Sequence, residues 1–361
     1  MYIKNLLLKN FRNYGDERIE FSDGLNVLFG KNGQGKTNCA EAVFYLCTGT
    51  SPRTRREKQL IKTGEEFAYI SCVCEGRYGE VEISARIFEN GREVKINGNK
   101  ITRNADLMGN VFAVFFSPQE LRLIQDGPDE RRRFLNVSIS QLSRPYFTAL
   151  SRYNKILEQR NNLLKNRDLD TVYDTLPVWD AQLCKYAAVV ASSRADYISK
   201  LAPLAAEAHS YLTDGREELK ILPEKKYKGG AEELEKKLFS ELSNNYDRDI
   251  RLGFTASGPH RDDLDIEING ADAKNFASQG QTRTAALAIK LAEVNVFKEA
   301  CGEFPVLILD DVMSELDLPR RKKLVGKTSG LQTIITCTHA ERVLYGKEVN
   351  KILIDGGAVK R

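Results

Sequence analysis

The sequence lacks the long apolar runs that cross membranes. Its longest uninterrupted apolar stretches contain about half a dozen residues, whereas a transmembrane helix needs roughly 20. The N-terminal segment also lacks the charged, apolar and small-residue regions that follow one another in a signal peptide. We therefore expect a cytoplasmic protein that makes no contact with a membrane.

Disulfides, zinc ligands and a strong net charge are missing as well. The 7 cysteines are an odd number, and Cys72 and Cys74 do not have the spacing of a metal-ligand pair, so we expect reduced thiols. The chain has 54 basic and 50 acidic residues, which leaves a net charge of +4. This balance permits nucleic-acid binding without requiring it, so the local clustering of basic residues is more informative than their sum.

The composition that remains is typical of a globular protein. Apolar residues make up 42% of the 361 residues, a length that suits one large domain with an insertion or two domains. Apolar patterns predict strands within residues 2–30, a sharp turn at Gly30 and a helix from about Lys36 to Cys47. Between Phe67 and Ile101, alternating runs separated by Asn-Gly pairs predict an antiparallel meander.

The middle of the chain has a helical pattern with scarcely any glycine. Apolar stripes over residues 142–164 and 183–211, joined by the polar stretch 165–177, predict an antiparallel coiled-coil hairpin with arms about 35 to 45 Å long. An ordinary helical bundle would use the same stripes, so the sequence leaves an extended arm and a compact lobe open. A further helix over residues 231–245 follows the polar linker 223–230.

Strands return after Arg248. Residues 251–270 predict a hairpin, a helix opens at Ser278, and apolar runs over 304–311 and 331–339 predict buried strands. This order predicts an α/β protein whose head is split by a helical insertion. We place the N-terminal part of the head at 1–125, the inserted arm at 126–247 and the C-terminal part of the head at 248–361.

Residues 30–37 match the phosphate-loop pattern, with a predicted strand before them and a helix after them. Glycines let backbone N–H groups surround phosphate oxygens, the lysine reaches the β- and γ-phosphates, and the last hydroxyl is a magnesium ligand. The alternative is an ordinary glycine-rich turn, which would not require a strand before it and a helix after it. We predict that ATP and Mg²⁺ bind the loop residues Gly30, Lys31, Asn32, Gly33, Gln34, Gly35, Lys36 and Thr37, with Lys36 also catalytic.

An acidic pair ends the apolar run over residues 306–310. Asp310 would reach the carboxyl end of a buried strand, where it can help hold magnesium opposite Thr37. Asp311 follows directly and is our candidate general base, which accepts a proton from the attacking water. The plainer alternative is a buried strand that ends in a solvated acidic turn.

The run Ser278-Gln279-Gly280-Gln281 is a capping box at the start of a predicted helix. A helix N-terminus with a serine hydroxyl and an accessible glycine is also an anion site. The phosphate loop already has a helix of its own, so a second one would be redundant within one active site. It is explained if Ser278, Gly280 and Gln281 bind the nucleotide of a second copy, which predicts an ATP-dependent homodimer.

Residues 51–58 concentrate basic side chains in one polar segment. Such a cluster supplies contacts to DNA phosphates that are independent of sequence and sensitive to salt. A solvated charge run is the alternative, and the sequence shows no motif for reading bases. The predicted DNA-binding residues are Arg53, Arg55, Arg56 and Lys58.

Taken together, these motifs resemble those of the SMC-like branch of ABC-type ATPases and, within it, the RecF family of bacterial recombinational repair proteins. The resemblance is carried in order along the chain by residues 8–14, 30–38, 116–121, 127–136, 257–264, 278–284 and 307–317. It implies an ABC-type ATPase head, made of a P-loop NTPase sheet and an antiparallel β subdomain, with an inserted helical, coiled-coil-like arm.

The resemblance also implies roles for individual residues. Ser278 would bind the γ-phosphate held by the partner subunit, and Asp317 would contact the partner subunit across the dimer interface. Arg12 and Asn13 fall where related heads contact the nucleotide, although a pair of turn residues explains them nearly as well. Gln119 falls at the position that senses magnesium and the γ-phosphate, with an exposed loop glutamine as the alternative.

Two further features match the family without an assigned role. His339 resembles the switch histidine of ABC proteins, but a histidine at the end of a strand is an equally good interpretation. Residues 258–263 belong to a shared motif whose purpose the sequence does not reveal.

The implied function is an ATP-driven dimer that clamps DNA at gaps and stalled forks. RecR and RecO would be its partners and would help to load RecA, while a weak, DNA-stimulated ATPase activity resets the clamp. The aspartate at 311 is one methylene shorter than the glutamate of ABC transporters, which favours slow turnover. A transporter ATPase subunit would lack the helical insertion, and a small-molecule kinase would not need the second helix end.

Overall fold

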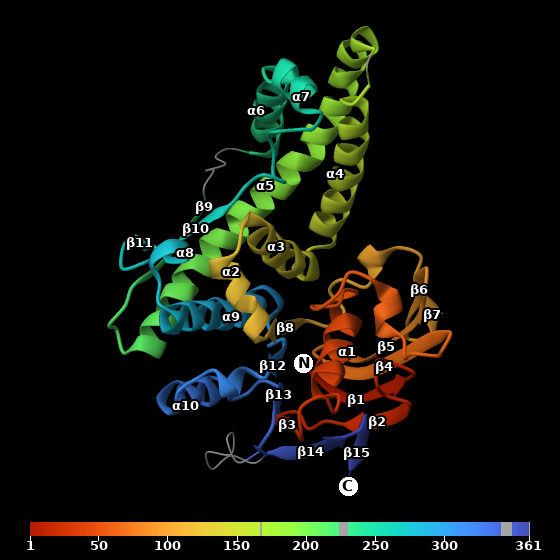
Figure 1. Ribbon diagram of the computed structural model, residues 1–361, viewed down its shortest axis with the longest axis vertical. Helices are drawn as coiled ribbons and strands as arrows, with labels where there is room; N and C mark the ends of the chain where they lie inside the picture. The colour runs from red at the N-terminus through yellow and green to blue at the C-terminus, as the bar shows by residue number, and fades with distance from the viewer. Residues whose placement is uncertain (167, 224–229, 341–348, 361) are drawn as a thin grey trace.

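The computed structural model describes residues 1–166, 168–223, 230–340 and 349–360. The molecule is elongated, with its two six-stranded sheets at one end and a long pair of helices leading away from them (Figure 1). Of the predicted linker, only residues 223 and 230 are described.

The central sheet takes strands from both ends of the chain, which confirms the predicted α/β class. Five of its strands run parallel, and β15 is an antiparallel edge strand. The order across the sheet is β15 (Ala358–Lys360), β14 (Asn350–Asp355), β3 (Leu25–Phe29), β13 (Thr333–Cys337), β12 (Val306–Asp310) and β8 (Ala113–Phe116). The loops that follow the parallel strands therefore share one edge of the sheet.

The central strands are apolar at almost every position because both faces of the sheet are buried. Val306 and Ile308 of β12 face one core, whereas Leu307 and Leu309 face the other, as the pleat requires. Helix α1 (Lys36–Thr48) packs into the first core together with the antiparallel sheet. Helices α9 (Gln279–Cys301) and α5 (Leu169–Thr213) contribute to the second core.

The predicted meander is confirmed as an antiparallel sheet. Its turns fall at the two Asn-Gly pairs, between β5 and β6 and between β6 and β7. The order across it is β2 (Asp16–Glu20), β1 (Tyr2–Lys9), β4 (Phe67–Gly76), β5 (Gly79–Phe88), β6 (Gly91–Ile96) and β7 (Asn99–Lys100).

Helix α4 (Arg144–Leu163) lies beside α5, as the two apolar stripes predict (Figure 1). The predicted arm length of about 35 to 45 Å is wrong for both helices. The 20 residues of α4 make it about 30 Å long, and the 45 residues of α5 make it about 68 Å long. Helix α5 is longer because its C-terminal half continues onto α9 and shares the core of the head. Helices α6 (Ala231–Ser243) and α7 (Tyr246–Leu252) pack against the side of the pair (Figure 1).

Two local predictions are also wrong. Most of the supposed polar connection 165–177 belongs to α5, because Asp168 caps the helix and Val172 and Leu176 are buried against Leu164. The hairpin predicted over 251–270 begins later. Its strand β10 (Leu264–Ile268) pairs with β11 (Ala271–Asp272) and with β9 (Leu219–Pro223), a strand that the sequence analysis did not predict.

The remaining elements are short, apart from α3. They are α2 (Arg122–Gln125), α3 (Pro128–Leu142), α8 (Ala273–Phe276), α10 (Leu318–Lys327) and 3₁₀ turns at Glu57–Leu60, Asn104–Asp106, Pro118–Leu121 and Val312–Ser314. Within the described ranges, no helix has both the length and the apolarity that crossing a membrane requires.

A buried ion triad joins the helices of the arm. Arg160 of α4 donates to Asp180 of α5 at 2.5 Å and to Asp249 of α7 at 2.7 Å, and all three side chains are 0% exposed. Thr255 accepts a further bond from the same guanidinium at 2.8 Å. Buried charges of this kind are tolerated only when they are paired.

We predict that Arg160→Met lowers the free energy of unfolding of the arm by about 3 to 5 kcal/mol, because it leaves two carboxylates buried without a counterion. The matched control is Lys236→Met, which removes an exposed ion pair with Glu232 and should cost less than about 1 kcal/mol. Urea titration followed by the fluorescence of Trp179, the only tryptophan, measures both. Equal losses for the two variants would contradict the structural role of the triad.

Candidate nucleotide-binding and DNA-binding site

The phosphate loop connects β3 to α1 at the shared edge of the central sheet. Gly30 has φ 143°, and a Cβ atom there would lie 2.3 Å from the carbonyl oxygen of Ile354. Gly35 has φ 116°, and its Cβ would lie 2.8 Å from Oδ1 of Asn13. Both positions require glycine because of the positive φ and because of these neighbours.

Lys36 lies inside the loop that it belongs to. Its Nζ donates to the carbonyl oxygens of Gly30 and Lys31, both at 2.7 Å. Burial lowers the pKa of Lys36, while the negative charges of Asp311 and Asp310 oppose this shift. The ammonium group is therefore held at the loop by neutral oxygens and faces the acidic pair.

Thr37 and Asp310 meet as the sequence predicts. The Thr37 hydroxyl donates to Oδ1 of Asp310 at 2.8 Å, and the Thr336 hydroxyl donates to the same oxygen at 2.7 Å. Burial raises the pKa of Asp310, and the two hydroxyl donors oppose the rise. A threonine hydroxyl beside a buried carboxylate provides the hard oxygen ligands that Mg²⁺ prefers, so these residues fit the ion.

Asp311 has an unusual backbone. Its φ of 54° is in the left-handed region, and its N–H donates to the Thr336 hydroxyl at 2.9 Å. Ser314 donates to the Asp311 carboxylate at 3.1 Å. The conformation turns the chain away from β12 directly after Asp310 and leaves the Asp311 side chain exposed.

Gln119 and His339 also follow strands of the central sheet. Gln119 is exposed in the 3₁₀ turn after β8, and β8 pairs with β12 in the register Phe116 to Leu309. His339 is exposed two residues after the end of β13. Both therefore emerge at the edge that carries Asp310, although within the described residues neither side chain forms a hydrogen bond or ion pair with it.

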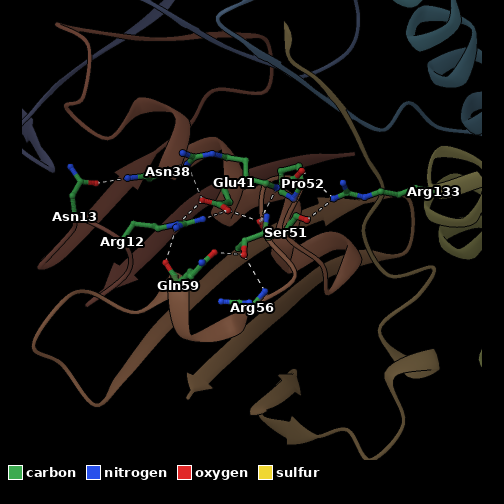
Figure 2. Close-up of polar contacts among 11 residues, drawn as sticks. Arg12, Asn13, Asn38, Glu41, Ser51, Pro52, Arg56, Gln59 and Arg133 are labelled. Atoms are coloured by element: carbon green, nitrogen blue, oxygen red, sulfur yellow. Dashed lines mark hydrogen bonds and ion pairs between the residues drawn. The ribbon is translucent and has the colours of Figure 1, made fainter. Parts of the chain in front are cut away.

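Arg12 does not point into solvent as a free side chain. Its Nε and one terminal nitrogen donate to the two carboxylate oxygens of Glu41 at 2.9 and 2.7 Å, and its other terminal nitrogen donates to the Gln59 carbonyl at 2.7 Å (Figure 2). Glu41 lies on α1, close to the phosphate loop, and its side chain is 0% exposed. The arginine is thus fixed beside the loop by a two-pronged ion pair.

Asn13 connects the same turn to the phosphate loop. Its Nδ2 donates to the Gln34 carbonyl at 2.9 Å, and its Oδ1 accepts from Asn38 at 2.8 Å (Figure 2). The predicted pair Arg12 and Asn13 therefore lies beside the phosphate loop, where Asn13 supports the loop's backbone.

The predicted basic segment divides into paired and unpaired cations. Arg53 donates to Asn38 at 2.8 Å and to Glu41 at 3.3 Å, and Lys58 pairs with Glu89. Arg55 and Arg56 are exposed, and neither guanidinium has an ion pair within the described part of the chain. The unpaired cations are therefore Arg55 and Arg56.

Glu41 is the functional residue that the sequence analysis missed. Its carboxylate accepts bonds from Arg12 beside the phosphate loop, from Arg53 in the basic segment and, at 2.5 Å, from the Ser51 hydroxyl (Figure 2). A single acidic residue within the apolar run of α1 was the available signal, because a buried carboxylate needs cationic partners.

The predicted helix start at Ser278 is confirmed. The Ser278 hydroxyl accepts from the Gln281 N–H at 3.3 Å, and the Gln281 side chain accepts from the Ser278 N–H at 2.9 Å. Ser278 and Gly280 are exposed, and no atom lies within 4 Å of the position of a Gly280 Cβ. Phe276, just before them, is 75% exposed.

The structure does not bring Ser278 to the phosphate loop of its own chain. Helix α8, which directly precedes Ser278, lies on the left of the molecule, well away from α1 (Figure 1). Asp317 caps α10 by accepting from the Arg320 N–H at 2.9 Å and from the Arg320 guanidinium at 2.7 Å.

Comparison with known families matches almost the whole chain. The pattern of the family described as RecF/RecN/SMC N terminal domain covers residues 2–359. Similar proteins include the DNA replication and repair protein RecF of Clostridium acetobutylicum, which is 41% identical over 363 residues and covers 99% of each chain. The protein of the same name from Acetivibrio thermocellus is 42% identical over 355 residues, with 94% of each chain covered.

Solved structures give the same result. A structure of the recombination mediator protein RecF-ATP in the RecFOR pathway is 34% identical, has a TM-score of 0.90 and covers 99% of this chain and 97% of its own. The Smc head domain of Pyrococcus furiosus is 17% identical with a TM-score of 0.57 over 99% of this chain and 95% of its own, a likeness in fold alone.

We predict that Glu41→Gln lowers the free energy of unfolding by about 2 to 4 kcal/mol, because Arg12 and Arg53 then lose the carboxylate with which both are paired. Glu89→Gln is the matched control, since it removes the exposed partner of Lys58 and should cost less than about 1 kcal/mol. The melting temperatures of the two variants, measured at the same salt concentration, are then compared. If both variants melt alike, Glu41 does not hold the two segments together.

Proposed function

The chain belongs to the RecF family of DNA replication and repair proteins, and from this premise we propose that ATP joins two copies of it around DNA. Hydrolysis then reopens the pair. The main observation that supports the proposal is the exposed capping box at Ser278, which lies away from the phosphate loop of its own chain.

ATP binds where backbone N–H groups of the phosphate loop point toward a phosphate. Lys36 exchanges its two neutral carbonyl partners for phosphate oxygens. The new hydrogen bonds are stronger because the phosphate oxygens are charged. Thr37 and Asp310 would hold Mg²⁺, which would neutralise the developing phosphate charge. Asn13 keeps the loop in place through the Gln34 carbonyl.

The family places the chain among ATPases of the ABC type. Asp311 is the proposed base that accepts a proton from the attacking water, and Gln119, which follows the neighbouring strand β8, is proposed to sense magnesium and the γ-phosphate. Ser314 and the backbone at Asp311 restrain the short carboxylate, so we propose weak turnover that increases when DNA is bound.

A second copy completes the pocket. The N-terminus of α9 carries partial positive charge, an exposed serine hydroxyl and an unobstructed glycine, which suit a terminal phosphate. Ser278, Gly280 and Gln281 of one subunit therefore contact the nucleotide held by the partner, with Asp317 at the same interface. The exposed Phe276 beside them would be buried when the two subunits meet.

DNA contacts come from the basic segment and are independent of sequence. Arg55 and Arg56 supply unpaired charge for phosphates, and Arg53 and Lys58 join them by exchanging their carboxylate partners. Each contact releases counterions, so binding weakens as salt rises.

The biological setting follows from the RecFOR pathway named for the similar structures. We propose that RecR and RecO are partners of the ATP-bound dimer at gapped DNA and that the assembly helps to load RecA. The chain would act in the cytoplasm, where bacterial chromosomal DNA is found.

Two variants separate nucleotide binding from pairing. Lys36→Met should abolish ATP binding and therefore dimerisation, because the β- and γ-phosphates lose their cation. Ser278→Arg should leave ATP binding intact and block the dimer, because a large side chain occupies the interface. Sedimentation velocity with ATP measures the mass, and a fluorescent ATP analogue measures binding.

Asn295→Arg on the same helix is the control for the second variant, because Asn295 lies far along α9 from its N-terminus. It should dimerise like the unmodified chain. An ATP-dependent dimer of Ser278→Arg would refute the shared pocket.

A further inference from the structure

The turn that follows the long helix α5 reaches the start of α9. Helix α5 ends at Thr213, and the chain enters β9 at Leu219 after a short turn. Asp214 and Gly215 have φ 56° and 71° there, and this left-handed backbone ends the helix. Glu217 lies in the turn, and its carboxylate contacts the first turn of α9.

Gln281 joins Ser278 to Glu217 through the two ends of its side-chain amide. The Gln281 Oε1 accepts from the Ser278 N–H at 2.9 Å, and the Gln281 Nε2 donates to Oε1 of Glu217 at 3.1 Å. An ionised carboxylate can only accept hydrogen bonds, and a backbone N–H can only donate one, so these partners permit a single orientation of the amide. Turning the amide by 180° would place two donors together at Ser278 and two acceptors together at Glu217.

This orientation determines which donors at the start of α9 stay available. The Ser278 hydroxyl accepts from the Gln281 N–H at 3.3 Å and donates to no group in the described part of the chain. The N–H groups of Gln279 and Gly280 belong to the first turn of the helix, where no intrahelical acceptor exists. Because Gln281 satisfies the Ser278 N–H, the hydroxyl proton and these two N–H groups remain for a ligand.

The Glu217 carboxylate depends on Gln281 in return. Its Oε2 is buried without a hydrogen-bond partner, and Nε2 of His209 lies 3.7 Å away, too far for a hydrogen bond. Burial lowers the pKa of His209, the backbone and charge of Glu217 oppose this shift, and Arg320 adds to it, so the ring is neutral at neutral pH. Among the described residues, Gln281 is therefore the one hydrogen-bond donor to this carboxylate.

The turn that carries Glu217 is fixed from both sides. Lys323 of α10 donates to the Asp214 carboxylate at 2.6 Å, at the end of α5. On the other side, the Glu218 N–H donates to Oδ1 of Asn269 at 2.8 Å, in the turn between β10 and β11. Glu217 thus holds the Gln281 amide from a position that does not depend on α9.

We propose that Glu217 is a positioning residue for the contact between Ser278 and the nucleotide of the partner subunit. Glu217 itself touches no nucleotide. It acts through Gln281, whose amide it keeps in the orientation that leaves the Ser278 hydroxyl free for the γ-phosphate. The proposal rests on the proposed function, because only a nucleotide held by a second copy would use these donors.

The first test replaces the carboxylate by an amide of the same shape. In Glu217→Gln the new amide can donate or accept, so both orientations of Gln281 become possible. With the full chain at saturating ATP, sedimentation velocity should show a dimer dissociation constant at least about tenfold higher. Each of the two pockets loses the difference between a charge-assisted and a neutral hydrogen bond. Binding of a fluorescent ATP analogue to the monomer should be unchanged, because the phosphate loop is elsewhere.

Glu218→Gln is the matched control. It makes the same change of charge one residue away and removes an exposed ion pair with Lys220, whose atoms are 3.2 Å apart. Because the Glu218 side chain does not contact Gln281, this variant should dimerise like the unmodified chain.

Hydrogen–deuterium exchange of the monomer without ATP gives a second measurement that does not require pairing. The Ser278 N–H is protected by Oε1 of Gln281, so it should exchange about fivefold faster in Glu217→Gln, where part of the amide population is turned. Glu218→Gln should keep the original rate. A general loss of stability would instead speed exchange along the whole of α9.

An unchanged dimer dissociation constant in Glu217→Gln would overturn the proposal. Weaker pairing with the original exchange rate at Ser278 would overturn it as well, because Glu217 would then act by another route. If the unmodified chain stays monomeric with ATP, the proposed function fails instead. The exchange measurement still decides in that case whether Glu217 orients Gln281.

Discussion

The structure depends on the parallel central sheet, whose strands all end at one edge. Because β3, β12 and β13 end there together, the Asp310 carboxylate lies within hydrogen-bonding distance of both Thr37 and Thr336. The left-handed turn at Asp311 and the exposed Gln119 occupy the same edge. One subunit thus brings its phosphate loop, Thr37, Asp310 and Asp311 to one edge, but the exposed helix end at Ser278 lies elsewhere. This separation is the reason why we propose that two subunits pair.

The contacts around Glu41 connect that edge with the basic segment at residues 51–58. One buried carboxylate serves Arg12 beside the phosphate loop and both Arg53 and Ser51 in the basic segment. Arg133 of α3 donates in turn to the Ser51 and Pro52 carbonyls, each at 3.1 Å (Figure 2). A displacement of Arg12 on nucleotide binding would therefore have to be accommodated at the basic segment, where α3 contacts the head.

Sequence reasoning succeeded where one local pattern decides the structure. The Asn-Gly turns, the capping box at Ser278 and the strand-loop-helix around Lys36 depend on neighbouring residues only. It failed where distant segments decide, as for the length of α5, which is set by packing on α9, and for β9, whose partner β10 lies beyond α6 and α7. Glu41 escaped notice for the same reason, since its partners come from two separate segments, the turn at Arg12 and the basic segment. The boundaries of the arm at 126 and 247 and the roles of the site residues stay predictions.

The central claim is that two subunits share each nucleotide, and a mixture of two defective variants tests it most directly. Lys36→Met keeps an intact Ser278, and Ser278→Arg keeps an intact Lys36, so a mixed pair has one complete pocket and one pocket with both defects. The account predicts that the mixture recovers ATP-dependent dimers and part of the ATP hydrolysis that each variant lacks alone. A mixture that is as inactive and as monomeric as its two components would contradict it.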